Sequence, residues 1–129
     1  MRRGGDCVRL LGERSDVQRI LGAADFFCLA SRREGLAFSL LEAMSLGLAA
    51  VVSDVPGNRE AVGEAGLRAP FGDRAAFAGA LAQLCRDPAL RKSLGERGRA
   101  RVAARFGARE MVSRTREVYD EVLRRRAAR

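Results

Sequence analysis

The sequence predicts an α/β fold, a Rossmann-like parallel sheet of about four strands followed by three C-terminal helices. Two observations lead to this prediction. Up to residue 72, short apolar runs alternate with helical periodicity, which is typical of a parallel sheet with crossover helices. From residue 73 onward the apolar residues recur only at helical spacing. The 129 residues contain no low-complexity linker, so we expect one domain, 1–129, with flexible ends at 1–6 and 124–129.

Four short apolar runs are the predicted strands, at residues 7–11, 25–30, 49–53 and 67–69. The run from Asp25 to Ala30 is almost continuously apolar, which is typical of a central strand that is covered on both faces. Residues 49–53 have the same character. The last run is short and ends at Pro70, which predicts an edge strand.

Two helices are predicted early in the chain. Ser15 or Asp16 is a suitable N-cap for a short helix that ends at Gly22. The next helix begins near Ala37 and ends at Gly47, because glycine is a common helix stop.

The remaining helices follow the third strand. A short helix is expected at 59–62, and Asp73 and Asp87 are N-caps of two longer ones, with Pro88 at the first helical position of the second. The pair 106–107 separates these from the last helix. That helix carries an apolar stripe formed by Met111, Val112, Thr115, Val118, Tyr119 and Val122.

The net charge of +8 is concentrated near the C-terminus. Residues 86–129 hold fourteen basic and six acidic residues, whereas residues 1–85 hold ten of each. Such a basic segment attracts nucleic acid, phosphorylated ligands or an anionic membrane surface. The simpler interpretation is a solvated helix face.

The composition also excludes several kinds of site. The chain has no histidine, which removes Ser-His and Cys-His pairs and all histidine metal sites. Its three cysteines have no Cys-x-x-Cys spacing and favour buried free thiols in a reducing cytoplasm. No apolar run approaches the roughly 18–20 residues that span a bilayer. We therefore expect a cytoplasmic protein, and the basic segment is compatible with peripheral binding at the inner membrane surface.

Residues 31–47, which follow the second predicted strand, form the expected ligand site. In open parallel sheets, ligands bind beyond the carboxyl ends of the strands. The loop leads into a helix whose free amides favour an anion such as phosphate, and Gly35 allows close approach of the backbone. Glu34 and Glu42 flank this position, so both could accept hydrogen bonds from ligand hydroxyls. Spacing alone leaves a simpler alternative, a solvated Glu34 and a Glu42 paired with an arginine.

The residues around this loop resemble a known family. Residues 31–47 read Ser-x-x-Glu-Gly-x6-Glu-Ala-Met-x-x-Gly, and residues 51–60 read Val-Val-Ser-Asp-Val-Pro-Gly-Asn-Arg-Glu. Both stretches are similar to the retaining glycosyltransferases of family 4, glycosyl transferases group 1, which have the GT-B architecture. Weaker similarity extends over residues 8–123. The similarity is to the later part of the C-terminal, donor-binding domain.

The resemblance implies a reaction and a set of site residues. The reaction is transfer of a sugar from a nucleotide-sugar donor, UDP- or GDP-linked, to an unknown acceptor, lipid-linked or saccharide, with retention of configuration. Glu34 and Glu42 are the implied catalytic residues, of which Glu42 would hold the donor ribose and Glu34 the transferred sugar. The other implied binding residues are Ser31, Arg33, Gly35, Leu36, Ala37 and Phe38. No cofactor is implied, and the lack of any Asp-x-Asp agrees with metal-independent chemistry.

Parts of the family pattern have no counterpart in this sequence, namely the acceptor-binding domain and the first two strands of the donor domain. Those strands would lie between the predicted strands 7–11 and 25–30. Either these two strands pair directly, or an apolar edge is left for a homodimer or for a partner chain that supplies the missing strands. The activity of the isolated chain stays open. The alternatives are a non-catalytic module that binds a nucleotide or nucleotide sugar or completes a partner, and, more remotely, a basic nucleic-acid-binding protein.

Overall fold

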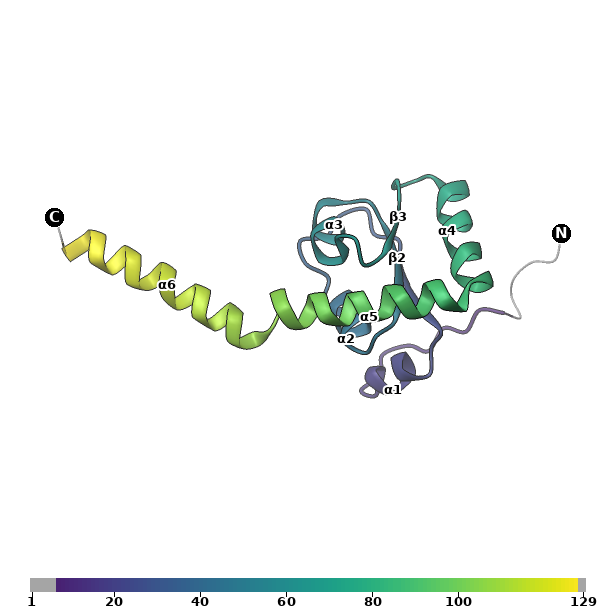
Figure 1. Ribbon diagram of the computed structural model, residues 1–129, viewed down its shortest axis with the longest axis horizontal. Coiled ribbons are helices and arrows are strands. Elements are labelled where there is room, and N and C mark those ends of the chain that lie inside the picture. Colours follow the sequence, from purple (N-terminus) through teal and green to yellow (C-terminus); the bar gives the residue numbers. More distant parts are fainter. Residues whose placement is uncertain (1–6, 128–129) are drawn as a thin grey trace.

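The computed structural model describes residues 7–127, in which helices and three parallel strands alternate in the first part of the chain and three consecutive helices complete it (Figure 1). The elements in chain order are α1 (Val17–Gly22), β1 (Phe26–Leu29), α2 (Phe38–Ser45), β2 (Ala49–Ser53), α3 (Pro56–Val62), β3 (Leu67–Ala69), α4 (Arg74–Arg86), α5 (Pro88–Arg105) and α6 (Ala108–Ala127). The strand order in the sheet is β1-β2-β3. The predicted α/β class and the three C-terminal helices are confirmed.

Strand β2 is the centre of the sheet and is buried along its whole length. It pairs with β1, where Phe26 lies opposite Ala49, and with β3, where Val51 lies opposite Leu67. Successive side chains of a strand point to opposite faces, so β2 contributes to two separate apolar clusters. This position explains its uninterrupted apolar sequence.

Helices cover both faces of β2. On one face, Leu40 and Met44 of α2 and Val62 of α3 pack with Val52 in one apolar cluster. On the other face, Leu84 of α4 packs with β2 in a second cluster. Helix α3 begins at Pro56, three residues earlier than the sequence predicts, because proline suits the first turn of a helix.

Helix α5 crosses the sheet at the amino end of β2 and joins the two clusters. Its Leu94 belongs to the cluster with α4, and its Val102 packs against the cluster with α2 and α3. Gly95 is buried against the turn that precedes β2, and a Cβ at this position would collide with the carbonyl oxygen of Gly47. From its sequence alone, a glycine at position 95 is expected to weaken α5. The structure shows that this glycine allows α5 to pack closely against the turn before β2.

Both predicted aspartate caps are confirmed. The Asp73 carboxylate accepts a hydrogen bond from the amide of Ala76 at 2.9 Å, and the Asp87 carboxylate accepts one from the amide of Leu90 at 2.8 Å. Each cap satisfies an amide that has no acceptor within its helix. These caps fix where α4 and α5 begin.

The predicted strand at 7–11 is wrong, and the sheet within residues 7–127 has three strands rather than four. Leu10 is 95% exposed and pairs with no other strand of the described chain. A strand requires a neighbouring strand to pair with, and the family strands that would join this segment to β1 have no counterpart in the sequence. Because the segment is exposed, water can satisfy its backbone polar groups instead.

Strand β1 is consequently at the edge of the described sheet, and the prediction of a central strand covered on both faces is wrong. Its apolar residues are half-buried and Cys28 is exposed. Cys7 and Cys85 are exposed as well, so the expectation of buried thiols is also wrong. The composition of the apolar run suits a strand with more neighbours than residues 7–127 provide.

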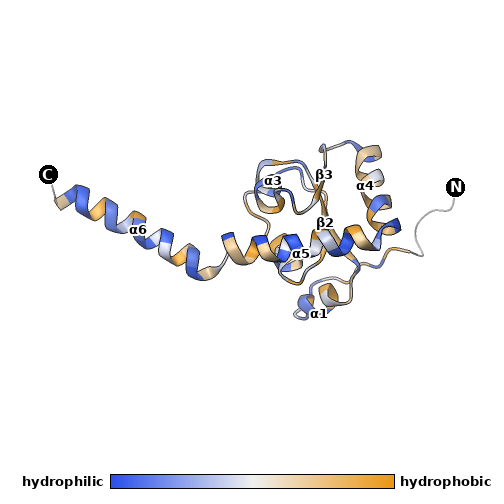
Figure 2. Cartoon of the chain, viewed as in Figure 1, coloured by the Kyte–Doolittle hydropathy of each residue, from blue (hydrophilic) through white to orange (hydrophobic). Residues whose placement is uncertain are grey.

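Helix α6 extends away from the body of the molecule (Figure 1). Apolar and polar bands alternate along it (Figure 2), and its predicted stripe is exposed, with Met111 at 63% and Tyr119 at 66%. The helix continues to Ala127, so residues 124–127, which the sequence predicts to be flexible, are helical. The predicted flexible segments 1–6 and 128–129 lie outside the described residues.

Replacement of Gly95 by alanine tests the close packing of α5. We expect Gly95→Ala to lower the free energy of unfolding by about 1–3 kcal/mol, because the added methyl group meets backbone that cannot move aside. Gly79→Ala in α4 is the matched control. A Cβ there meets nothing within 4 Å, so the substitution should stabilise the helix by about 0.5–1 kcal/mol. Urea unfolding of both variants measures the difference, and equal effects would contradict the packing assignment.

Candidate functional site

The carboxyl ends of the three parallel strands lie at one edge of the sheet, and the loops that follow them form the candidate site. The loop after β1 runs from residue 30 to residue 37 and leads into α2. The loop after β2 leads through Asp54 and Val55 into α3. Helix α5 crosses at the opposite, amino end of β2, so it leaves this edge open.

Ser31 and Glu34 are brought together in the loop after β1. The Ser31 hydroxyl donates a hydrogen bond to Glu34 Oε1 at 2.6 Å, a length typical of a charge-assisted bond to a carboxylate. Glu34 is half-buried. The simpler alternative of a freely solvated Glu34 is therefore not observed, since Ser31 holds its carboxylate in a defined orientation.

Helix α2 presents its N-terminus at the same edge. Its N-cap residue is Ala37, which has no side-chain acceptor. The amides of Phe38 and Ser39 therefore have no acceptor among the described residues, whereas the amide of Leu40 already donates to the Ala37 carbonyl oxygen. Phe38 is 76% exposed beside them, and Gly35 and Leu36 are exposed in the loop before them. The backbone at this N-terminus is accessible to a ligand.

Glu42 lies one turn further along α2 and is exposed. Its carboxylate forms no hydrogen bond or ion pair with any residue from 7 to 127. An arginine partner for Glu42 is therefore not observed, which removes the simpler alternative for this residue. Arg33 is exposed in the loop.

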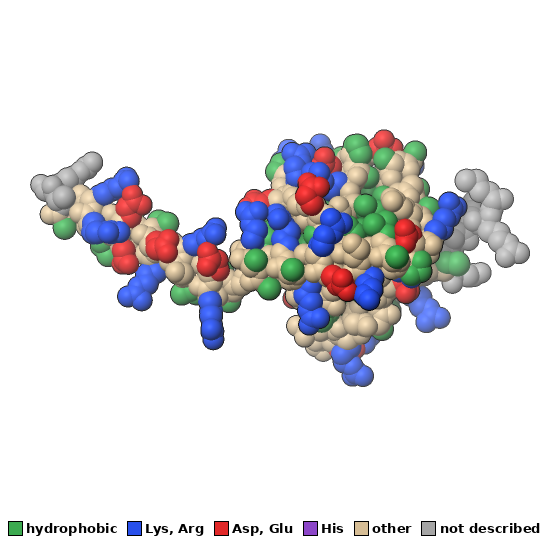
Figure 3. Space-filling model, viewed as in Figure 1, with side chains coloured by type: hydrophobic (Ala, Val, Ile, Leu, Met, Phe, Trp, Pro, Cys, Tyr) green, Lys and Arg blue, Asp and Glu red, His purple; other side chains and the backbone are tan. Residues whose placement is uncertain are grey.

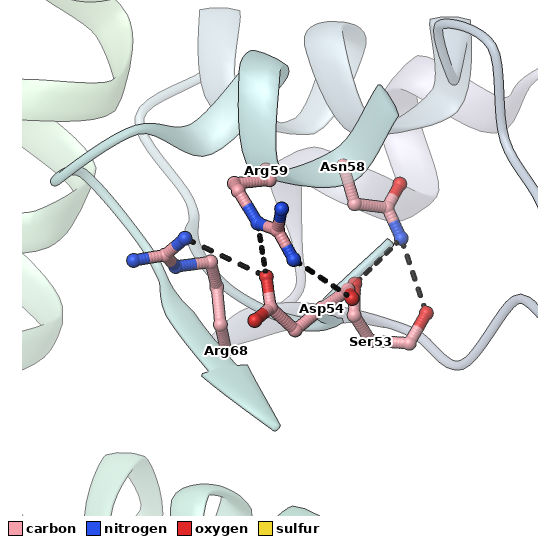
Figure 4. A network of polar contacts seen from close by, with 5 residues as sticks. All are labelled: Ser53, Asp54, Asn58, Arg59 and Arg68. Carbon is pink, nitrogen blue, oxygen red and sulfur yellow. Dashed lines mark hydrogen bonds and ion pairs between the residues drawn. The ribbon is translucent and has the colours of Figure 1, made fainter. Parts of the chain in front are cut away.

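The loops after β1 and β2 are joined by buried side chains that the sequence did not single out. Ser53, at the end of β2, donates its hydroxyl to the carbonyl oxygen of Ser31 at 2.5 Å. The Asn58 amide donates to the carbonyl oxygen and the hydroxyl of Ser53, at 3.1 and 3.2 Å (Figure 4). Gly57 lies so close to this loop that a Cβ would collide with the carbonyl oxygens of Glu34 and Gly35. Ser53, Gly57 and Asn58 all lie in residues 51–60, one of the two stretches that carry the family resemblance. That shared location is the sequence feature that could have pointed to them.

An apolar cavity of about 520 Å³ lies at the same edge, between the strand ends and α4. Its lining includes Ala30, Ser53, Phe71, Phe77 and Leu81. None of the predicted binding residues lines it. Ser53 is shared between the cavity and the polar contacts with the loop after β1, so the cavity adjoins the predicted site without containing it.

An ion-pair cluster lies on the other side of the β2–α3 loop. The guanidinium of Arg59 contacts the Asp54 carboxylate at 2.8 Å, and that of Arg68 contacts it at 3.5 Å (Figure 4). The hydrogen bond from Arg59 lowers the pKa of Asp54 and raises the pKa of Arg59. The pairing links the start of α3 to β3.

The basic C-terminal segment is a mixed surface. In Figure 3 acidic and basic side chains intermingle along α6. Arg114 pairs with Glu110 and Arg116 with Asp120, each one turn apart, and Arg125 pairs in the same way with Glu121. This arrangement supports the solvated helix face over a uniformly basic surface for nucleic acid.

Two further properties concern the described residues as a whole. No helix in the described range combines the length and apolar character required to cross a bilayer. Between residues 7 and 127 no three Cys, Asp or Glu side chains are grouped as ligands for a metal ion. Metal independence itself stays a prediction.

The family assignment follows from comparison with known proteins. Residues 1–87 match the family model described as glycosyl transferases group 1. The chain belongs to this family. The matched region contains the whole sheet and the site at its carboxyl edge, as the resemblance of residues 31–60 indicated.

Relatives of this group 1 glycosyltransferase chain match across most of its length. The N-acetyl-alpha-D-glucosaminyl L-malate synthase of Bacillus anthracis is 33% identical over 92% of the chain and 32% of its own length. The N,N'-diacetylbacillosaminyl-diphospho-undecaprenol alpha-1,3-N-acetylgalactosaminyltransferase of Campylobacter jejuni is 34% identical over 91% of the chain and 31% of its own length. The chain thus spans about a third of the length of these relatives.

A solved structure confirms the GT-B relationship of the fold. The sucrose-phosphate synthase from Thermosynechococcus elongatus superposes with a TM-score of 0.74 and 31% identity. The superposition covers 81% of this chain and 27% of that one.

Acid titration tests the ion pair of Asp54. Because its pKa is lower in the folded state, Asp54 stabilises the fold above the unfolded pKa of about 4, and this contribution is lost as the pH falls through the folded value. We expect Asp54→Asn to lower the urea midpoint at pH 7 and to have a smaller effect at pH 3 and below. Glu64→Gln, at an exposed residue, is the control. An Asp54→Asn effect that is independent of pH would contradict the pairing.

Proposed function

We propose that this chain is the donor-binding part of a retaining glycosyltransferase that uses a UDP- or GDP-sugar. The observation that carries the proposal is the N-terminus of α2 at the carboxyl edge of the sheet, uncapped by any side chain and flanked by Glu34 and Glu42. Family membership supports the transferase chemistry. The sheet edge supports the location, because ligands of open parallel sheets bind there.

The diphosphate of the donor would lie against the first turn of α2. Amides without intrahelical partners and the positive end of the helix dipole favour an anion at this place. Gly35 and Leu36 are exposed next to it, so the backbone can approach the ligand. During transfer the bond from the anomeric carbon to the diphosphate breaks, a bond to an acceptor hydroxyl oxygen forms, and a proton and the nucleoside diphosphate are released. Fixed amides stabilise the charge that grows on the diphosphate, in keeping with metal-independent chemistry.

The two glutamates would bind the two sugars on either side of the diphosphate. Glu42 is exposed and unpaired within the described chain, so both oxygens can accept hydrogen bonds from a ribose diol. Glu34 is oriented by Ser31 and would hold hydroxyls of the transferred sugar. Ser31, Arg33, Ala37 and Phe38 complete the proposed donor contacts.

The names of relatives support a lipid-linked acceptor over a free saccharide. Relatives from Campylobacter jejuni and Escherichia coli are named for transfer to diphospho-undecaprenol-linked sugars. We propose an acceptor of this kind, and with it a cytoplasmic protein that binds the inner membrane surface peripherally. The acceptor-binding half would be supplied by residues other than these 129.

Substitution of Glu42 tests the ribose contact. We expect Glu42→Gln to weaken binding of UDP or GDP at least tenfold in calorimetry, because a bond to a charged acceptor is worth about 1.5–3 kcal/mol. Glu64→Gln is the matched control and should leave affinity unchanged, since Glu64 is exposed after the end of α3. Unchanged affinity of Glu42→Gln would refute the ribose assignment. Hydrolysis of a nucleotide sugar by the unsubstituted chain would show that it is active alone.

A second candidate function is a module that completes a partner, and the open edge of β1 favours it. Strand β1 has no neighbour on its outer side among residues 7–127, and the α6 stripe is exposed. Unpaired strand edges and exposed apolar stripes are typical of association surfaces. We therefore propose that the chain associates with a second copy or with a chain that supplies the missing strands.

Sedimentation tests self-association. We expect the chain to sediment as a dimer at micromolar concentration, and Val118→Glu on the α6 stripe to shift it toward the monomer. Glu117→Gln, beside the stripe, is the control. A monomer at every concentration would contradict the homodimer. The second candidate function would then require association with a different chain.

A further inference from the structure

A continuous series of hydrogen bonds runs from the buried start of α3 to the carboxylate of Glu34. Asn58 donates to Ser53, Ser53 donates to the Ser31 carbonyl oxygen, and the Ser31 hydroxyl donates to Glu34. Asn58 is completely buried and Ser53 is 2% exposed. The series therefore links the core of the molecule to an acidic side chain at the open edge of the sheet.

The direction of each bond is fixed by the chemistry of the donors. A serine hydroxyl has one proton, and Ser53 donates it to the Ser31 carbonyl oxygen, so in the bond with Asn58 the Ser53 hydroxyl oxygen is the acceptor. The amide of Asn58 also donates to the Ser53 carbonyl oxygen, which holds the amide plane in place. The position of the Ser31 backbone is thus determined by two buried side chains from β2 and α3. Its hydroxyl then determines where the Glu34 carboxylate lies.

A second contact between α3 and the same loop is independent of these bonds. Gly57 packs directly against the carbonyl oxygens of Glu34 and Gly35, with no room for a Cβ. Helix α3 consequently constrains the loop at two places, at Ser31 through Asn58 and Ser53 and at residues 34–35 through Gly57. The loop cannot shift relative to α3 without breaking one contact or the other.

Asn58 is a polar side chain in the core, and its hydrogen bonds within the described residues are all with Ser53. Its two amide protons go to the Ser53 carbonyl oxygen and to the Ser53 hydroxyl. Its Oδ1 atom is buried and has no hydrogen-bond partner within residues 7–127, which lowers stability. An apolar side chain of similar shape would avoid this cost, but it would leave the Ser53 hydroxyl without its donor. Asn58 therefore acts on the site through Ser53.

We propose that Asn58 and Ser53 are positioning residues that set the place of Glu34 at the sugar end of the donor site. This inference rests on the proposed function, since Glu34 is the residue assigned to the transferred sugar. Neither residue touches the donor; each acts through Ser31. Glu42 lies on α2 and has no contact with the series, so the ribose end of the site is independent of it.

The two ends of the donor site give the proposal a measurable signature. Loss of the series should weaken binding of the complete nucleotide sugar, which needs Glu34. It should weaken binding of the free nucleoside diphosphate much less, because that ligand would be held chiefly by the first turn of α2 and by Glu42. A variant that merely destabilised the fold would weaken both ligands together.

Calorimetry of Ser53→Ala and Asn58→Leu with UDP, GDP and the corresponding glucose nucleotides tests this signature. We expect about a tenfold loss of affinity for the nucleotide sugar that the unsubstituted chain binds, and less than twofold for its diphosphate. Ser31→Ala, at a half-buried residue, should have the same effect with less risk to folding, and Ser31→Thr should restore affinity because it keeps the hydroxyl. Ser113→Ala in α6, which removes another serine near a glutamate, is the matched control. Equal losses for both ligands, or no loss, would overturn the proposal.

NMR relaxation separates this proposal from the proposed function. Order parameters of the backbone amides of residues 31–36 should fall in Ser53→Ala and Asn58→Leu relative to the unsubstituted chain, whereas those of α4 should not. Unchanged order parameters in the loop would overturn the positioning role whatever the ligands do. If the unsubstituted chain binds none of the four ligands, the proposed function is wrong, and lowered order parameters would then establish the loop restraint without its role in the donor site.

Discussion

The structure depends on the complete burial of one short strand. Strand β2 pairs with both other strands and is covered by α2 and α3 on one face and by α4 on the other. Burial on both faces requires every backbone group to be paired and every side chain to be apolar or satisfied. The apolar run of β2 ends at Ser53, and a turn follows. Both lie where the chain leaves the core.

That constraint also explains the location of the candidate site. At the carboxyl end of β2 the first polar side chain, Ser53, is still buried and must find partners. It finds them in the loop after β1 and in α3, so the same bonds that satisfy the core also orient Glu34. Packing and site geometry are coupled at this residue, while α5 closes the amino end of the sheet and leaves the carboxyl edge accessible.

The open side of the molecule has the opposite character. Strand β1 and α6 carry apolar residues that the described chain does not cover. The chain spans about a third of the length of its relatives. Many charged side chains of α6 form ion pairs one turn apart. The exposed apolar stripe, rather than the net charge, is therefore the property that sets α6 apart from the other helices.

The sequence by itself determined the α/β class, the bounds of β2 and β3, the two aspartate caps and the position of Glu34 and Glu42 beside a helix N-terminus. These features follow from local signals: periodicity, capping chemistry and a motif contiguous in the chain. It did not determine that residues 7–11 are unpaired, that β1 lies at an edge or that Gly95 lies under a turn, because strand pairing and close packing involve residues far apart in the chain. For the same reason, only the tertiary structure revealed that Asn58 and Ser53 reach Glu34 through Ser31, since the pairing of β1 with β2 brings Ser31 beside Ser53.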